Sequence, residues 1–319
     1  MPFVRVTVLA GGVGGSRFLL GLRTLGHDVT VIGNTGDDIT MFGLRICPDL
    51  DTVMYTLGGG ISAERGWGRE DESFRVRDEI AEYDTEPAWF GLGDLDLATH
   101  LLRTRWLAEG QTLSEVTARL GERWQPGVRL LPATDDPVET HVTLVDGRTV
   151  HFQEWWVRLH ADVAATAIRL AGADSARPAP GVVAAIRDAD VVLFPPSNPV
   201  VSIGAILSVP GIADAVRTTP APVVALSPIV GGAPVRGMAD ACLTAIGVET
   251  SAAAVARHYG RRPAGLIDGW LVDEVDKAVA DELADEGWPA RAVPLMMTDT
   301  EATAAMASAA LDLAVEIRQ

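Results

Sequence analysis

A glycine-rich turn near the start of the chain constrains the fold most. Residues 3–10 are almost all apolar, Gly11-Gly12-Val13-Gly14-Gly15 follows, and apolar residues then recur at helical spacing from Ser16 to Leu25. A continuous apolar run is typical of a strand buried on both faces of a parallel sheet. A second such strand follows at 29–32. This order of strand, glycine turn, helix and strand predicts an α/β fold with a Rossmann-like, mainly parallel sheet.

The rest of the chain extends this pattern, with one interruption. Further buried strands are predicted at 191–194 and 223–226, and helices near 181–188, 204–217, 236–247 and 299–317. Between about 60 and 175 the chain is rich in tryptophan and charge. Helical patterns occupy 94–108 and 112–124 there, and strand-like pieces at 140–146 and 149–153 flank Asp146-Gly147, a hairpin signal. We therefore expect a single domain over 1–319, with about 60–175 forming an inserted subdomain of helices and a hairpin.

The glycine turn predicts a phosphate-binding loop. Glycines let the backbone approach a phosphate, and the start of a helix offers free N–H groups and a positive dipole end. A turn without a ligand is the alternative. The dinucleotide fingerprint is broken, because Arg17 occupies the third glycine position and the second strand ends in Gly33-Asn34 without an acidic ribose-binding residue. An NAD(P)-dependent oxidoreductase is therefore disfavoured.

Aspartates follow the second strand. Asp37 and Asp38 come directly after Asn34-Thr35-Gly36, and Asp49 and Asp51 lie about a dozen residues further on. Mg²⁺ is commonly held by one or two carboxylates together with phosphate oxygens of the substrate. One aspartate could also accept a proton from an attacking hydroxyl. A helix cap or an Asx-turn is the structural alternative for an Asp-Asp pair, and the neighbouring phosphate loop favours the functional interpretation.

Three further segments carry polar residues that suit a binding site. Two of them, at 195–202 and 227–232, follow buried strands and lie at the edge where parallel sheets bind ligands. The third segment is residues 91–100, in which Asp94 is expected to cap a helix and His100 is either a structural or a functional residue. The tryptophans Trp67, Trp155 and Trp156 are predicted to be core or interface residues.

Composition excludes several classes of function. The formal net charge is −17, so there is no overall basic footprint for nucleic acid or an anionic membrane. Lys277 is the only lysine, which excludes a Walker A loop and disfavours Schiff-base chemistry. The two cysteines, Cys47 and Cys242, give no disulfide framework or metal motif, and the histidines lack zinc-ligand spacing. We expect a cytoplasmic protein without a membrane span.

Six motifs in order resemble the 2-phospho-L-lactate transferase family, the CofD/FbiA group. The resemblance covers nearly the whole chain. The segment from His151 to Arg158 and the shortage of lysine look most like the actinobacterial phosphoenolpyruvate transferase branch. The motifs are Gly11-Gly12-Val13-Gly14-Gly15-Ser16-Arg17, Asn34-Thr35-Gly36-Asp37-Asp38, Pro48-Asp49-Leu50-Asp51-Thr52, residues 93–100, Ser197-Asn198-Pro199 and Ser227-Pro228-Ile229-Val230-Gly231-Gly232.

The resemblance implies a reaction in the synthesis of the deazaflavin coenzyme F-420. The donor would be a guanosine diphosphate ester of phospholactate or of phosphoenolpyruvate, and the sequence does not choose between them. The acceptor would be the terminal ribityl hydroxyl of the deazaflavin Fo, and GMP would be released. Mg²⁺ would be required, and the family implies a homodimer.

The resemblance also implies roles for individual residues. Asp37 and Asp51 would hold Mg²⁺, and Asp37 or Asp38 would orient or deprotonate the acceptor hydroxyl. The diphosphate would lie on the glycine turn, the guanosine on the 197–202 segment, and the 227–232 segment would close that pocket. The residues implied to bind the substrates are Gly12, Gly14, Gly15, Arg17, Asn34, Thr52, Asp94, His100, Ser197, Asn198, Ser202, Ser227, Gly231 and Gly232. A non-enzymatic nucleotide-sugar sensor of related fold is the nearest rival, because such a protein would need no acceptor pocket.

Overall fold

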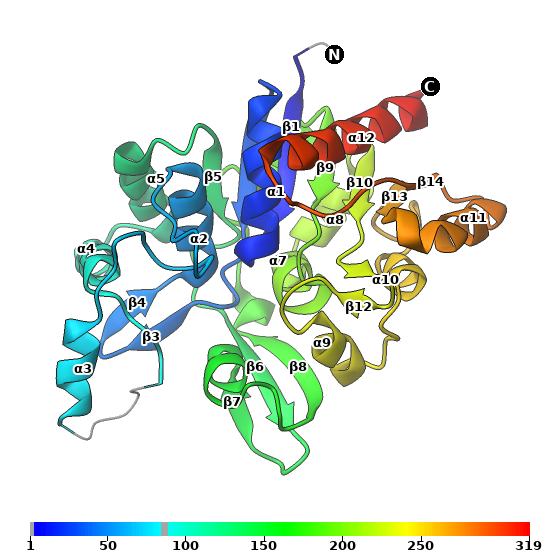
Figure 1. The fold of residues 1–319 in the computed structure, drawn as a ribbon. Coiled ribbons are helices and arrows are strands. Elements are labelled where there is room, and N and C mark those ends of the chain that lie inside the picture. Colours follow the sequence, from blue (N-terminus) through cyan, green and yellow to red (C-terminus); the bar gives the residue numbers. More distant parts are fainter. Residues whose placement is uncertain (1–2, 84–88) are drawn as a thin grey trace.

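The central element is a seven-stranded sheet in which every neighbouring pair of strands is parallel. The computed structural model describes residues 3–83 and 89–319. The strand order is β14-β13-β10-β9-β1-β2-β5. Their bounds are β1 Arg5–Ala10, β2 Asp28–Gly33, β5 Arg129–Pro132, β9 Val191–Phe194, β10 Val223–Leu226, β13 Gly269–Val272 and β14 Ala290–Ala292. The predicted α/β fold with a Rossmann-like parallel sheet is confirmed (Figure 1).

Helices cover both faces of this sheet, because its strands are buried on both sides. On one face, α1 (Gly12–Thr24), α2 (Pro48–Leu57) and α12 (Thr300–Arg318) pack against alternate residues of β1 such as Val6 and Val8. On the other face, Leu9 and Phe194 belong to a second apolar cluster. Helices α6 (Val182–Arg187), α7 (Ala205–Ser208), α8 (Ile212–Thr218), α9 (Ala239–Ala245), α10 (Ala252–Tyr259) and α11 (Lys277–Asp285) contribute to that cluster.

The strands predicted near 3–10, 29–32, 191–194 and 223–226 are present, but β13 and β14 were not predicted. The helix expected over 204–217 is divided into α7 and α8. The break lies at Pro210-Gly211, where Gly211 has a φ of +94°. No single helix in the described part of the chain is long and apolar enough to cross a membrane. The bent pair Pro199–Ser208 and Ile212–Thr218, with 91° between its halves, passes that test only when both halves are taken together.

The 60–175 segment is only partly an insertion. It contains α3 (Arg75–Ala81), α4 (Asp94–Ala108) and α5 (Leu113–Trp124), so the helices predicted over 94–108 and 112–124 are present. It then returns to the main sheet as the edge strand β5, which the prediction missed. A separate three-stranded antiparallel sheet follows, in the order β7-β6-β8, from β6 (Glu139–Leu144), β7 (Thr149–His151) and β8 (Ala165–Ala171).

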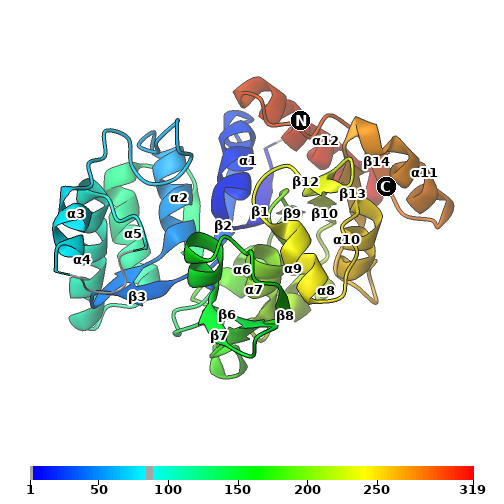
Figure 2. The same cartoon turned by 60° about the horizontal axis from the view of Figure 1, so that its bottom comes forward.

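The hairpin predicted at Asp146-Gly147 joins β6 to β7, and Gly147 adopts a φ of +86°. In both views the group α3–α5 and the small sheet β6–β8 lie apart from one another beside the main sheet (Figures 1 and 2). The short hairpin of β3 (Ile39–Met41) and β4 (Leu44–Ile46) runs from the core to the helical group (Figure 1). The intervening segments therefore supply walls beside the main sheet.

Candidate functional site

A cavity of about 1050 Å³ opens at the carboxyl edge of the main sheet. The segments that follow β1, β2, β9, β10 and β14 all line it. The sequence analysis expected ligand-binding loops at this edge, because parallel strands end there together. The tertiary structure adds walls from the 46–68 and 90–100 segments and from residues 152–160 and 235–239.

The glycine turn forms one wall. Helix α1 begins at Gly12, which has a φ of +61°, and its N-cap residue Gly11 provides no side-chain cap. The first N–H groups of α1 border the cavity and receive no side-chain cap from Gly11, as suits an anion site, although the Gly12 N–H donates to the Asp49 carboxylate. Gly12 and Gly14 line the cavity, as does Gly11, which the prediction omitted. Gly15 does not line it. A Cβ there would lie 2.9 Å from Ser197 Oγ, so Gly15 serves close packing instead.

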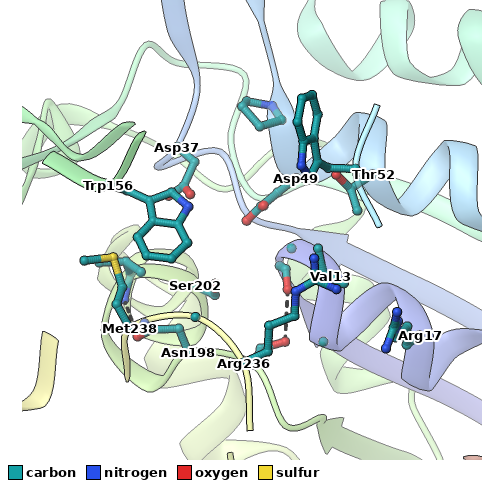
Figure 3. Close-up of a pocket in the computed structure, with 18 of the residues that line it drawn as sticks. Val13, Arg17, Asp37, Asp49, Thr52, Trp156, Asn198, Ser202, Arg236 and Met238 are labelled. Carbon is teal, nitrogen blue, oxygen red and sulfur yellow. Dashed lines mark hydrogen bonds between the residues drawn. The ribbon is translucent and has the colours of Figure 1, made fainter. Parts of the chain in front are cut away.

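Asn34 holds two buried carboxylates side by side. Its Nδ2 donates to Asp37 Oδ1 at 3.2 Å and to Asp49 Oδ2 at 2.8 Å, and Gln153 Nε2 donates to Asp37 Oδ2 at 3.1 Å. Both aspartates line the cavity, and Figure 3 shows both pointing into it. Asn34 itself is fully buried behind them, so it positions the carboxylates and is not among the lining residues.

Burial raises the pKa of both carboxyl groups. Desolvation raises the pKa of Asp37 well above its ordinary value, and the neighbouring charge of Asp49 adds to this. Desolvation also raises the pKa of Asp49, to about 6, although hydrogen bonds from Asn34 and the Gly12 backbone oppose the shift. Two buried carboxylates this close favour a shared cation or a shared proton.

The structure does not place Asp38 in the cavity. Cys47 Sγ donates to Asp38 Oδ2 at 3.0 Å, and the Arg45 guanidinium lies 3.5 Å from the same oxygen. Burial raises the pKa of Asp38 to about 7, although Arg45 opposes this. Asp38 is absent from the cavity lining. The alternative in which Asp38 contacts the acceptor is therefore corrected, because adjacent residues of this turn point to opposite sides.

Asp51 belongs to a different group from Asp37. It forms a buried ion pair with Arg103, and its Oδ2 lies 3.8 Å from His100 Nδ1. His100 Nε2 is 3.4 Å from Asp96 Oδ2. Among the described residues, Asp51, Asp96 and His100 each bring one potential ligand atom within 4.8 Å of the others. Asp49, which the prediction mentioned but did not assign, is the carboxylate that lies beside Asp37.

His100 and Thr52 line the cavity as predicted, but Asp94 does not. Gly93 is the N-cap of α4, and Asp94 is its first residue. The Asp94 carboxylate instead accepts hydrogen bonds from Ser73 Oγ at 2.6 Å and from the backbone N–H of Val76 at 3.0 Å, at the start of α3. Asp94 therefore anchors α3 to α4, and its implied binding role is corrected.

The wall from the 195–202 segment contains all three residues predicted there. Ser197, Asn198 and Ser202 line the cavity. Asn198 Oδ1 accepts from the N–H groups of Val200 and Val201 and so caps the π-helical turn that spans Pro199–Gly204. Ser197 Oγ donates to the Gly11 carbonyl at 3.1 Å, which ties this wall to the glycine turn.

The 227–232 segment contributes only its first residues. Ser227 lines the cavity, and its Oγ donates to the Ile229 carbonyl at 2.7 Å. Gly231 and Gly232 lie in the turn between β11 (Ile229–Val230) and β12 (Ala233–Pro234), outside the lining. The N–H of Gly231 instead donates to Asp276 Oδ2 at 2.9 Å. The prediction that these two glycines close the pocket is corrected; the following residues 235–239 line it.

An aromatic and apolar wall was not foreseen. Trp155 is fully buried, as expected of a core residue. Trp156 and Trp67 line the cavity with 39% and 44% of their surface exposed, together with Phe90 and Met238. These two tryptophans were predicted to be core or interface residues, and the core alternative was therefore wrong. No periodicity signals this, because Trp67 and Trp156 border one cavity only in the folded chain.

Two arginines border the cavity in the described chain, namely Arg17 and Arg236. Arg17 was predicted from its place beside the glycine turn. Arg236 was missed, because it lies in a loop between β12 and α9 with no motif around it. Its Nη2 donates to the Arg65 carbonyl at 2.9 Å, close in the chain to the lining residue Trp67. Figure 3 shows its side chain reaching toward Val13.

Comparison with known proteins identifies the family of this chain. A model of the family described as 2-phospho-L-lactate transferase CofD matches residues 6–311. The chain belongs to this family. A protein of Streptomyces griseus named phosphoenolpyruvate transferase is 62% identical over 320 residues, covering 99% of this chain and 100% of the relative. A protein of the same name from Thermobifida fusca is 61% identical over 329 residues, covering 99% of each chain.

Family membership identifies the chain as a transferase and confirms the resemblance, including its actinobacterial character. A crystal structure of a UPF0052 family protein from Bacillus halodurans has a TM-score of 0.64 at 19% identity, covering 98% of this chain and 99% of that one. At that level of identity the likeness concerns the fold alone.

Proposed function

We propose that the protein transfers a phosphoenolpyruvyl group from a guanosine diphosphate donor to the ribityl hydroxyl of Fo, releasing GMP, in coenzyme F-420 synthesis. One observation carries this proposal. A helix start that suits phosphate, a pair of buried carboxylates that suits Mg²⁺, and an aromatic wall that suits a flat acceptor all border a single cavity. The names of the relatives favour phosphoenolpyruvate over phospholactate.

The reaction is a displacement at phosphorus. The Fo hydroxyl oxygen forms a new P–O bond to the phosphorus that carries the enolpyruvyl group, and the bond from that phosphorus to the GMP oxygen breaks. The hydroxyl proton passes to a carboxylate, and GMP leaves with the electron pair. Positioning and charge stabilisation supply most of the rate enhancement in such transfers. The chain therefore has to align two substrates more than it has to supply covalent chemistry.

The two oxygens of Asp37 face different surroundings. Oδ1 accepts from Asn34 on the side shared with Asp49, whereas Oδ2 accepts from Gln153, which lies in the same segment as Trp156. We assign Asp37 and Asp49 to Mg²⁺, which would neutralise the phosphates. Asp37 Oδ2, on the aromatic side, would orient the acceptor hydroxyl and take its proton.

The substrates then occupy opposite halves of the cavity. The diphosphate would lie against the N–H groups at the start of α1, with the guanosine beside Ser197, Asn198 and Ser202. Fo would stack between the Trp67 and Trp156 walls, which offer large apolar faces with polar edges. Thr52 and His100 would border the diphosphate, on the side of the cavity formed by α2 and α4.

The deciding experiment is mass spectrometry of the product formed from Fo, Mg²⁺ and each synthesised donor. We expect the phosphoenolpyruvyl adduct of Fo together with GMP, and a lower rate with the phospholactyl donor. Asp37→Asn should abolish turnover, because it removes both the proton acceptor and a metal ligand. Full Mg²⁺-dependent turnover by D37N would refute the assignment to Asp37.

The rival is a nucleotide-sugar sensor, and the aromatic wall argues against it because a sensor needs no acceptor site. Titration of intrinsic Fo fluorescence tests this directly. Saturable quenching supports the transferase, and absence of Fo binding together with UDP-sugar binding would favour the sensor. We also propose a homodimer, as the family resemblance implies, and light scattering of the purified chain would measure it.

A further inference from the structure

The cavity has an unusual balance of charge for a site that binds a diphosphate. Four aspartates line it, namely Asp37, Asp49, Asp51 and Asp96, against two arginines in the described chain. The Asp51 carboxylate is already paired with Arg103. A diphosphate that enters this cavity therefore needs cationic partners in addition to a metal ion, since uncompensated anions repel at short range.

Arg236 is an exposed arginine at the border of the cavity whose side chain reaches a second segment of the chain. It starts from the loop after β12, and Nη2 donates to the Arg65 carbonyl, two residues before the lining residue Trp67. A Cβ on Gly66 would lie 2.8 Å from Arg236 Nη1, so the glycine leaves room for the guanidinium. Gly66 also has a φ of +72°. In Figure 3 the Arg236 side chain reaches toward Val13, whereas Arg17 lies further along α1.

A guanidinium carries five N–H donors in a planar fork, and only one Arg236 contact to protein appears among its hydrogen bonds. Arg236 lines the same cavity as Gly12 and Val13 at the start of α1, so its other donors are available to an anion held there. Planar recognition of phosphate by arginine uses two parallel N–H donors, which lysine does not provide.

We infer that Arg236 is an anion-binding residue that contacts the phosphate group distal to the nucleoside and joins the Trp67 wall to that phosphate. The inference rests on the proposed function, in that a diphosphate occupies the cavity. The same side chain then links two events: binding of the diphosphate, and placement of the segment that carries Trp67. Arg236 is a binding and positioning residue for the group that is transferred.

The experiment measures binding of inorganic pyrophosphate, GDP and GMP by calorimetry in the presence of Mg²⁺. Arg236→Ala should weaken pyrophosphate and GDP binding by about 10- to 100-fold, the range for a hydrogen bond to a charged group, and leave GMP binding nearly unchanged. Arg236→Gln keeps an N–H donor for the Arg65 carbonyl and removes the charge, so it should show the same loss. Arg236→Lys should recover only part of the affinity.

The outcomes separate the possibilities. Wild-type affinity of R236Q for pyrophosphate would mean that Arg236 only fastens the Arg65 loop, and the inference would be overturned. Failure of the wild-type protein to bind pyrophosphate or GDP would overturn it as well. If R236A weakens pyrophosphate but wild type binds GDP no better than pyrophosphate, the anion site stands and the guanosine part of the proposed function fails.

Discussion

The buried carboxylate of Asp49 should destabilise the metal-free protein at neutral pH. Its pKa is raised from 3.8 to about 6, mainly by desolvation. Because the folded state holds the proton more tightly, this group lowers stability as the pH rises from 3.8 to about 6, and the penalty is complete above that range. About two pKa units at 1.36 kcal/mol per unit amount to about 3 kcal/mol.

Asp49→Asn removes this charge and nearly keeps the shape of the side chain. The Asn34 Nδ2 group still finds a carbonyl oxygen, but the second oxygen, near the Gly12 N–H, becomes an amide nitrogen. Loss of that hydrogen bond reduces the gain to about 1–2 kcal/mol. We therefore expect D49N to be more stable than wild type by this amount in urea denaturation at pH 7.5 with EDTA.

Changes of pH and of Mg²⁺ concentration test whether the charge of Asp49 causes this difference in stability. At pH 4.5 the Asp49 carboxyl is protonated in the folded protein, so the advantage of D49N should disappear. Addition of Mg²⁺ at pH 7.5 should stabilise wild type and barely affect D49N, and the wild-type affinity for Mg²⁺ should rise from pH 5 to 7.5. Asp285→Asn, at an exposed position on α11, is the matched control and should change little. A D49N protein less stable than wild type at both pH values would refute the electrostatic reasoning.

Three other substitutions test separate parts of the structure. Arg103→Met leaves Asp51 buried without its cation and should lower the free energy of unfolding by about 3–5 kcal/mol in urea denaturation, whereas Asp51→Asn combined with it should recover part of the loss. Gly21→Ala places a Cβ against the backbone of α12 and should lower the free energy of unfolding by about 1–3 kcal/mol. The control Gly121→Ala meets open space within a helix and should raise the free energy of unfolding by up to about 1 kcal/mol. Equal shifts in melting temperature for the two variants would contradict the packing argument. Trp156→Ala should weaken Fo binding by about 1–3 kcal/mol in a fluorescence titration, and unchanged affinity would rule out a stacking role.

Local chemistry made much of the fold predictable. The strand at β1, the start of α1 and the strands β9 and β10 follow from apolar runs bounded by glycine, proline and polar residues, which report on neighbours in the sequence. Strand β14 was missed because its three residues, Ala290-Arg291-Ala292, form no apolar run, and β13 because only three apolar residues follow Gly269 in it. Strand β5 was assigned to an insertion because the sequence does not say which sheet a strand joins.

The candidate site, like the fold, was predictable from the sequence only in part. The sequence by itself determined that glycine, aspartate, serine and asparagine residues gather at one edge of a parallel sheet, because the carboxyl ends of parallel strands meet there. It also placed the chain with its family. The direction of each side chain was not determined, since neighbours such as Asp37 and Asp38, or Trp155 and Trp156, look alike in the sequence yet face opposite surroundings.

Only the tertiary structure decided which carboxylates are partners. Asp49 and Asp51 are two residues apart at the start of α2, so they lie on different sides of the helix. Asn34 joins Asp49 to Asp37, and Arg103 draws Asp51 toward His100. The tertiary structure likewise brought Arg236 to Arg65. These pairings depend on residues far apart in the chain, and such contacts form only when the core fixes the distances between segments.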